Sequence, residues 1–162
     1  MRELKARIRF TSACLGSVRK TVAGEAGKQT KFVMPRGADG HVRFEKNWWL
    51  SGLRFAAQLI NRHQDQVSKV LVDSKVLSDT SVETIFPRRV PKGLVHHECF
   101  PAGMTVEIHF AVPSEITNEE FKQLLDKMGQ FRGISPFGLR QYGHFAVDHL
   151  EPCEGGNAGE DP

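Results

Sequence analysis

The sequence contains no long apolar run. None of its hydrophobic stretches approaches the roughly 18 residues that a membrane-spanning helix requires. The N-terminal stretch MRELKARIRF lacks the apolar core of a secretory signal peptide. We therefore expect a cytoplasmic location and no membrane partner. A chain of 162 residues is long enough to bury a hydrophobic core and fits one domain.

Cysteine is scarce, and its spacing shows no pairs. Cys14, Cys99 and Cys153 are odd in number and far apart, which argues against a disulfide framework and a cysteine zinc site. The densest group of metal-ligating residue types is the run 96–99, HHEC. No second group at zinc spacing accompanies it. We expect no metal and no other cofactor, and we interpret this run as a loop between two strands.

Motifs of common enzymes are also missing. The chain has no P-loop, GxSxG, HExxH or supported paired-carboxylate pattern, so a non-catalytic role is favoured over an enzymatic one. One catalytic alternative stays open. If His109 and His144 lie on neighbouring strands, their imidazoles, or His144 with His63, would act as general acid and base in metal-independent RNA cleavage. A histidine on an open sheet face is more often solvated or stacked on a base.

Basic residues are absent from the end of the chain. Four acidic residues follow Leu150, namely Glu151, Glu154, Glu160 and Asp161. We expect residues 151–162 to form a disordered acidic tail. The net charge is +3, so residues 1–150 carry +7. This excess suits a polyanionic partner, although the same charges would also keep a domain soluble.

Alternating apolar residues predict strands. Lys5 to Phe10 turns its apolar side chains to one face and Arg7 and Arg9 to the other, which indicates a half-buried strand with a cationic outer face. The clearest strand is 104–112, in which every second residue from Met104 is apolar. Further strands are expected at 82–86 and 142–150. Residues 64–81 are ambiguous; we favour a short helix or an irregular segment, although KVLVDSKVL also fits a strand.

Two helices are predicted. The first is capped by Asn47 and continues through WWLSGLRFAAQLINR, with its tryptophans packed in the core or at the helix entry. The second covers Asn118 to Met128. Thr117 and Glu120 form its capping box, and Gly129 takes the C-cap position.

Residues 11–46 show no sustained periodicity. Glycine and proline interrupt this stretch, and a long loop inside a compact domain is usually functional or disordered. Basic residues are frequent in it: Arg19, Lys20, Lys28, Lys31 and Arg36. We interpret the stretch as a long basic loop inserted after the first strand and as a nucleic-acid contact region, partly mobile without a ligand.

The predicted elements follow the order βαββαβ. This order is typical of an α+β, ferredoxin-like fold with a four-stranded antiparallel sheet and both helices on one face. We expect one such domain over residues 1–150. The sheet face without helices would stay open for a ligand.

A glycine-rich stretch, 129–150, separates the second helix from the last strand. It combines Gly133, Gly138 and Gly143 with arginine and aromatic residues. Backbone N–H groups and arginine forks bind phosphate, and aromatic faces stack on bases. A helix end followed by a plain surface loop would have a similar composition.

The glycine-rich stretch resembles that of the RAMP superfamily, the CRISPR-associated ferredoxin-like RNA-binding proteins. The resemblance rests on Gly129, Arg132, Gly133, Gly138, Arg140 and Gly143, followed by HFAV at 144–147. The opening FTSACLGS and the helix WLSGLRFAAQLI occupy the corresponding early positions. The chain is also similar to short reading frames of phage genomes in IRFT, LGS, FPRR and YGHFAV. These likenesses imply a phage protein in the cytoplasm of a bacterial host, with Arg132, Arg140 and the adjacent glycines touching a nucleic-acid backbone.

The leading hypothesis is a non-catalytic module that binds RNA or another single-stranded nucleic acid through its backbone. The alternatives are a protein-interaction module that acts on a host immune complex or self-assembles, and the metal-independent endoribonuclease. Residues expected to touch the nucleic acid are Arg7, Arg9, Arg19, Lys20, Arg36, Arg88, Arg89, Arg132, Gly133, Phe137, Gly138, Arg140, Tyr142 and Gly143.

Overall fold

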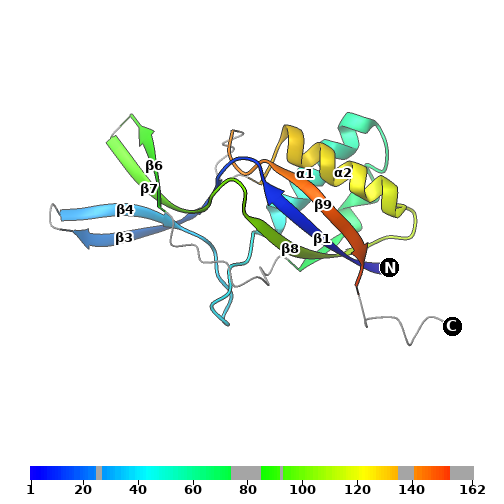
Figure 1. Ribbon diagram of the computed structural model, residues 1–162, viewed down its shortest axis with the longest axis horizontal. Helices are drawn as coiled ribbons and strands as arrows, with labels where there is room; N and C mark the ends of the chain where they lie inside the picture. The colour runs from blue at the N-terminus through cyan, green and yellow to red at the C-terminus, as the bar shows by residue number, and fades with distance from the viewer. Residues whose placement is uncertain (25–26, 74–84, 92, 135–140, 154–162) are drawn as a thin grey trace.

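The computed structural model describes residues 1–24, 27–73, 85–91, 93–134 and 141–153. Two β-sheets lie side by side in it, and two helices pack against only one of them (Figure 1). The other sheet extends away from the helical half of the molecule. None of the helices in these ranges is both long enough and apolar enough to cross a membrane.

The first sheet contains four strands in the order β5-β8-β1-β9. Its strands are β1 (Arg2–Phe10), β5 (Leu71–Asp73), β8 (Thr105–Val112) and β9 (Phe145–Pro152). All its pairings are antiparallel. With helices α1 (Lys46–Ile60) and α2 (Asn118–Phe131) on one face, this α+β arrangement is compatible with the expected ferredoxin-like fold.

The strands predicted from clear alternation are confirmed. On β1 the apolar residues Ala6, Ile8 and Phe10 are fully buried, and the apolar residues of β8 are buried in the same way. Strand β9 continues to Pro152, two residues past the expected end of the domain at Leu150. Residues 154–162, the rest of the expected tail, lie outside the described part of the chain.

Helix α2 begins as predicted and ends later. Thr117 Oγ1 accepts a hydrogen bond from Glu120 N, and Glu120 Oε1 accepts one from Thr117 N, at 3.1 and 3.0 Å. This confirms the capping box. The helix continues to Phe131, however, so the prediction that Gly129 ends it was wrong. A Cβ on Gly129 would lie 2.2 Å from the carbonyl oxygen of Phe145, which shows that this glycine lets α2 approach β9.

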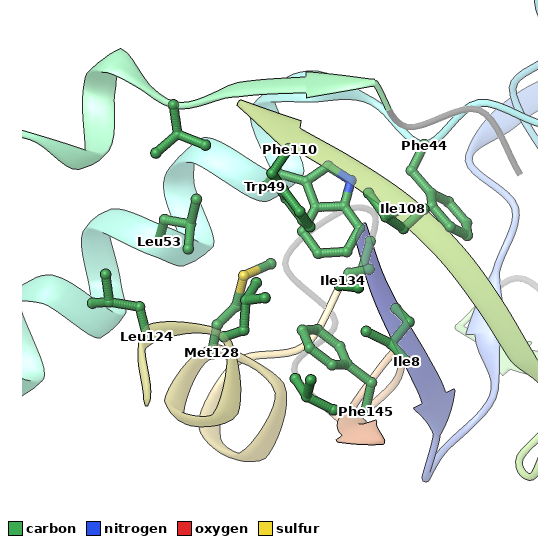
Figure 2. Packing of buried hydrophobic residues seen from close by; sticks show 14 of the residues in the cluster. Ile8, Phe44, Trp49, Leu53, Ile108, Phe110, Leu124, Met128, Ile134 and Phe145 are labelled. Atoms are coloured by element: carbon green, nitrogen blue, oxygen red, sulfur yellow. The ribbon is translucent and has the colours of Figure 1, made fainter. Parts of the chain in front are cut away.

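Helix α1 begins one residue before its predicted cap. Glu45 takes the N-cap position without a side-chain hydrogen bond, so the prediction of an Asn47 cap was wrong. The buried core lies between the helices and the first sheet (Figure 2). Trp49 is fully buried there, with its ring 5.3 Å from that of Phe110 and 5.9 Å from that of Phe145. The prediction that a tryptophan packs in the core is confirmed.

The prediction of a long loop over residues 11–46 was wrong for its first half, because strands within residues 14–33 belong to the second sheet, whereas residues 34–45 contain no named helix or strand. The second sheet contains β2 (Cys14–Leu15), β3 (Val18–Gly24), β4 (Gly27–Val33), β6 (Ile85–Val90) and β7 (Gly93–Phe100). Strands β3 and β4 form a hairpin, β4 is parallel to β7, and β6 is antiparallel to β7. The hairpin carries no strong apolar alternation because neither of its faces is covered by a helix.

The strand that completes the first sheet was also misplaced. Residues 67–69 form a 3-10 helix, η1 (Val67–Lys69), and Leu71–Asp73 is strand β5. The predicted strand 82–86 instead overlaps β6 of the second sheet, and its residues 82–84 lie outside the described ranges. Pro87 does not end β6, because a proline without an N–H is tolerated in an edge strand.

Candidate nucleic-acid interface

The open face of the first sheet was expected to be cationic, and it is neutralised instead. The outward basic residues of β1 each meet a carboxylate on a neighbouring strand. Lys5 Nζ lies 3.1 Å from Glu151 Oε1, Arg7 Nη2 lies 3.2 Å from Glu107 Oε1, and Arg9 Nη2 lies 3.3 Å from Asp148 Oδ1. The two charges of such a pair largely cancel at distances greater than their separation, and salt screens the remaining field over about 8 Å. The prediction of an uncovered positive face on this sheet was wrong.

The second sheet keeps its positive charge. The residues of its five strands include one acidic residue, Glu98, and six basic residues, namely Arg19, Lys20, Lys28, Lys31, Arg88 and Arg89. Glu98 is already engaged, because its Oε1 accepts hydrogen bonds from Arg36 Nη2 at 3.0 Å and from Met34 N at 2.8 Å. The second sheet is therefore more basic than the first, and Arg36 is held at its border by Glu98.

One face of the second sheet carries a row of rings. Backbone pairing places Arg19 opposite Phe32, Phe32 beside His97, and His97 opposite Phe86. Paired residues of adjacent strands share a face. The rings of Phe32 and His97 stack at 4.8 Å with 15° between their planes. Tyr142 packs its ring edge-on against Phe86 at 5.4 Å. We call Phe32, His97, Phe86 and Tyr142 the aromatic row.

The two faces of the second sheet differ. Arg88 shares the face of the aromatic row with Phe86, two residues before it on β6, whereas Arg89 points to the opposite face. Lys20 and Lys31 are paired with each other and also lie on the opposite face. Phe32, Phe86, Arg88 and Tyr142 are partly exposed, so the three rings of the aromatic row other than His97 can be reached from solvent.

His97 is fully buried and joins β7 to its neighbours. Arg88 Nε donates a hydrogen bond to His97 Nε2 at 3.0 Å. Because Nε2 accepts, the proton lies on Nδ1, which donates to the carbonyl oxygen of Gly16 at 2.8 Å. Burial is the main cause that lowers the pKa of His97. The side chain is thus a neutral imidazole.

The run His96 to Cys99 is part of strand β7, so our interpretation of it as a loop was wrong. Successive strand residues point to opposite faces, which separates His96 from His97 and prevents their convergence on one ion. No group of three or more His, Cys, Asp or Glu side chains that could hold a metal occurs in the described ranges.

Two glycines of the glycine-rich stretch allow residues 133–134 to pack directly against Gly143. Gly133 and Gly143 have φ angles of +74° and +73°, and Ile134 N donates to the carbonyl oxygen of Gly143 at 2.8 Å. A Cβ on Gly143 would lie 1.5 Å from the carbonyl oxygen of Ile134. Gly143 N also donates to Ala13 O at 2.8 Å. These glycines are required for the close approach of the two chain segments.

The other predicted nucleic-acid contacts of the glycine-rich stretch lie in different parts of the structure. Arg132 is the C-cap residue of α2, with its Nη2 3.4 Å from Ser51 Oγ and its guanidinium 5.9 Å from the centroid of the Phe55 ring. Arg132 therefore lies on the helical layer, whereas Arg88 and Arg89 lie on the second sheet (Figure 1). Tyr142 packs against Phe86, which lies on the same face of β6 as Arg88. The predicted contacts Phe137, Gly138 and Arg140 lie outside the described residues.

The histidine pair required by the nuclease hypothesis is not assembled. Strand β1 lies between β8, which carries His109, and β9, which follows His144. His109 is paired with Lys5, and Phe145 is paired with Phe10. Lys5 and Phe10 are five positions apart along β1, which corresponds to roughly 17 Å. The remaining candidate, His63, has its Nε2 2.8 Å from Glu120 Oε2 near the start of α2, whereas His144 Nδ1 lies 3.0 Å from the Gln130 carbonyl oxygen near its end. The structure therefore does not support the alternative in which these histidines act together.

Sequence reasoning missed Phe32, Phe86 and His97. Their strands contain polar residues on both faces, so apolar alternation does not reveal them. A hairpin signal was nevertheless present. Residues 85–90 and 93–100 flank a short link that begins with Pro91, and Gly93 follows it directly, a composition typical of the turn between two paired strands.

Comparison with known proteins finds solved structures with a similar fold. No protein-family model matches the chain, and no curated protein matches it. Among 77 matching chains of solved structures is one from a Type IV-B CRISPR complex. Its TM-score is 0.55 at 9% sequence identity, and the match covers 99% of this chain and 94% of that chain. The likeness therefore extends over both sheets, and the chain has a fold found in a CRISPR-associated complex.

Proposed function

We propose that the protein is a non-catalytic module that binds the sugar-phosphate backbone of single-stranded RNA on its second sheet. The observation that carries this proposal is the charge of the second sheet, where six basic residues accompany one carboxylate that Arg36 already engages. Phosphate binding with release of counterions requires such an excess of Lys and Arg.

The aromatic row favours a nucleic acid over other polyanions. Partly exposed rings beside arginines are the combination that binds single strands, because phosphates pair with the cations and bases stack on the rings. A fold shared with a chain of a Type IV-B CRISPR complex supports the same class of ligand. With the sequence resemblance, it also supports our proposal that the first sheet and its helices are a RAMP-like unit. Our proposal that a phage encodes the protein is based on the sequence resemblance alone.

The salt dependence of RNA affinity tests this function. We would measure the Kd of a fluorescent single-stranded RNA by anisotropy at several salt concentrations. Each lost phosphate contact reduces the slope of log K against log salt by about 0.7. The variant Arg19→Ala/Lys20→Ala/Lys31→Ala should therefore reduce the slope by about 0.7 if the RNA contacts only the face of the aromatic row, where Arg19 lies, and by about 2 if the RNA also reaches Lys20 and Lys31 on the opposite face.

A matched control removes the same charge from the first sheet. The variant Lys5→Ala/Arg7→Ala/Arg9→Ala also loses three positive charges, but these are already paired with carboxylates. It should keep the slope of the unmodified protein. Equal slopes in both variants, or an affinity that salt does not change, would refute binding on the second sheet.

A protein partner is the second candidate function. On the face opposite the aromatic row, Val18 and Leu94 are 41% and 56% exposed, and β3 is an edge strand that can accept a further strand. The structurally similar chain belongs to a complex. We infer that this face would contact another protein, such as a subunit of a host immune complex or a second copy. A defined assembly that survives nuclease treatment in light scattering would support this inference, and a monomer would count against self-assembly.

A further inference from the structure

Arg88 is oriented in an unusual way, by a neutral histidine and not by a carboxylate. Its Nε donates to His97 Nε2 at 3.0 Å, and His97 is itself fixed by Gly16 O at 2.8 Å and by the Phe32 ring. Among the described residues, neither Nη1 nor Nη2 of Arg88 has a hydrogen-bond partner. The guanidinium therefore keeps its full charge and two donor nitrogens, while its third nitrogen fixes its direction.

Among the described residues, no negative charge on the face of the aromatic row compensates His97. Arg88 of β6 faces His97. On β3, the nearest charged residue on the same face is Arg19, which lies on the far side of Phe32. From β4 His97 meets the Phe32 ring, and from the β2–β3 link it meets a carbonyl oxygen. Its neighbours His96 and Glu98 point to the other face of β7. A carboxylate in the place of His97 would have neutralised Arg88, whereas an imidazole orients it without cancelling its charge.

Rings adjoin this oriented guanidinium. Phe86 lies two residues before Arg88 on the same face of β6, and the Tyr142 ring packs edge-on against it at 5.4 Å. Phe86 and Tyr142 are both partly exposed. An accessible ring face next to a fixed phosphate ligand matches the two chemical parts of a nucleotide, its base and its phosphate.

We propose that Arg88, Phe86 and Tyr142 form a nucleotide subsite, in which Arg88 binds a phosphate, one of the two rings stacks on the adjoining base while the other, with its plane at 75° to the first, flanks that base, and His97 is the positioning residue for Arg88. The proposal rests on the proposed function and adds to it a location on the aromatic face and a role for a buried histidine. Lys20, Lys31 and Arg89, on the opposite face, take no part in the subsite.

Binding of a ten-nucleotide oligouridine and of an abasic ribose-phosphate oligomer of the same length tests the subsite. Arg88→Lys keeps the charge but loses the oriented fork, and we expect an affinity loss of about tenfold. His97→Phe keeps a ring beside Phe32 but removes both nitrogen contacts, and a similar loss is expected. Because both changes remove one interaction, the double variant should lose little more than either single variant. His97→Gln retains an acceptor and a donor and should restore most of the affinity.

The rings have a separate readout. Phe86→Leu and Tyr142→Leu should weaken oligouridine binding by about tenfold and leave binding of the abasic oligomer unchanged. Thermal unfolding would show whether each variant is folded. If His97→Phe does not fold, the comparison of Arg88→Lys with His97→Gln and the two ring variants still decide the subsite.

Two results would overturn the proposal. One is a fully additive loss in the double variant, and the other is unchanged affinity in all the subsite variants. If the latter occurs while Arg19→Ala/Lys20→Ala/Lys31→Ala still flattens the salt slope, the second sheet binds RNA but the subsite is wrong. If oligouridine does not bind the unmodified protein at all, the proposed function itself fails.

Discussion

The two sheets of this protein present basic residues in different settings. On the first sheet, Lys5, Arg7 and Arg9 each pair with a carboxylate from β8 or β9. On the second sheet, six basic residues accompany a single carboxylate that binds Arg36 and the backbone. A count of Lys and Arg does not distinguish the sheets. The position of the acidic residues on neighbouring strands does, and it separates a solvated face from a candidate binding surface.

The sheets also differ in what covers them. Both helices pack on the first sheet and enclose the large core residues with it (Figure 2), while the second sheet extends beyond the helical layer (Figure 1). We therefore expect the first sheet and its helices to determine stability and the second sheet to determine binding. Each of the following changes would break or sharpen this division.

The largest effect is expected in the core. Trp49→Ala removes a fully buried ring and should reduce the free energy of unfolding by about 3–5 kcal/mol. Phe86→Ala removes a partly exposed ring of the second sheet and should reduce it by roughly 1–2 kcal/mol. Chemical denaturation would measure both. Equal losses would show that stability is not concentrated in the helical half.

A substitution at the close contact between Gly143 and Ile134 should destabilise the fold nearly as much. Gly143→Ala places a Cβ against the Ile134 carbonyl oxygen at a positive φ, and we expect a loss of roughly 3 kcal/mol or more in unfolding free energy. Gly40→Ala is the matched control, since Gly40 also has a positive φ but has nothing within 4 Å of its added Cβ. It should cost about 1 kcal/mol. A small loss of unfolding free energy in Gly143→Ala would contradict close packing of Gly143 against Ile134.

Removing the acidic partners should give the first sheet the charge of the second. The triple change Glu107→Gln/Asp148→Asn/Glu151→Gln leaves Lys5, Arg7 and Arg9 without their carboxylates. Exposed pairs contribute at most about 1 kcal/mol each, so the fold should persist. The slope of log K against log salt for single-stranded RNA should steepen by up to about 2. An unchanged slope would show that ion pairing is not what keeps RNA off this face.

The smallest effect concerns acid stability and should not touch binding. Hydrogen bonds from His63 and then from the backbone of Thr117 lower the pKa of Glu120 from 4.5 to about 2. Because the folded-state pKa is lower, its stabilisation is fully present above pH 4.5 and is lost as the pH falls toward 2.

Glu120→Gln tests this pH dependence. It should lower the melting temperature at neutral pH and have little effect near pH 2. Glu119→Gln, in the same helical turn, is the control and should show no such change with pH. RNA affinity should stay the same in both variants. A constant effect of Glu120→Gln across this pH range would contradict the account.

Much of the first sheet could be predicted from the sequence, since its signals are local. The capping box at Thr117 and the alternation in β1 and β8 each depend on a few adjacent residues, and the structure confirms them. Strand β5, with three residues, is too short for a periodic signal. Gly129 and Gly133 are both plausible helix ends in sequence, and only packing against β9 distinguishes them.

The candidate site was harder to predict because its contacts are distant in sequence. Arg7 meets Glu107 only through the pairing of β1 with β8, so the neutralisation of the first sheet follows from strand register. The link from Arg88 through His97 to Gly16 likewise requires three separate segments. Arg19, Lys20, Arg88 and Arg89 were named from their charge alone, and the structure places all four on the second sheet.

Chemical-shift mapping tests the central claim most directly. Backbone amide spectra of the isotope-labelled protein would be recorded during titration with oligouridine. Perturbations confined to β3, β4, β6 and β7, with β8 and β9 unchanged, are the predicted result. Perturbations centred on β1, β8 and β9, with the second sheet silent, would contradict it.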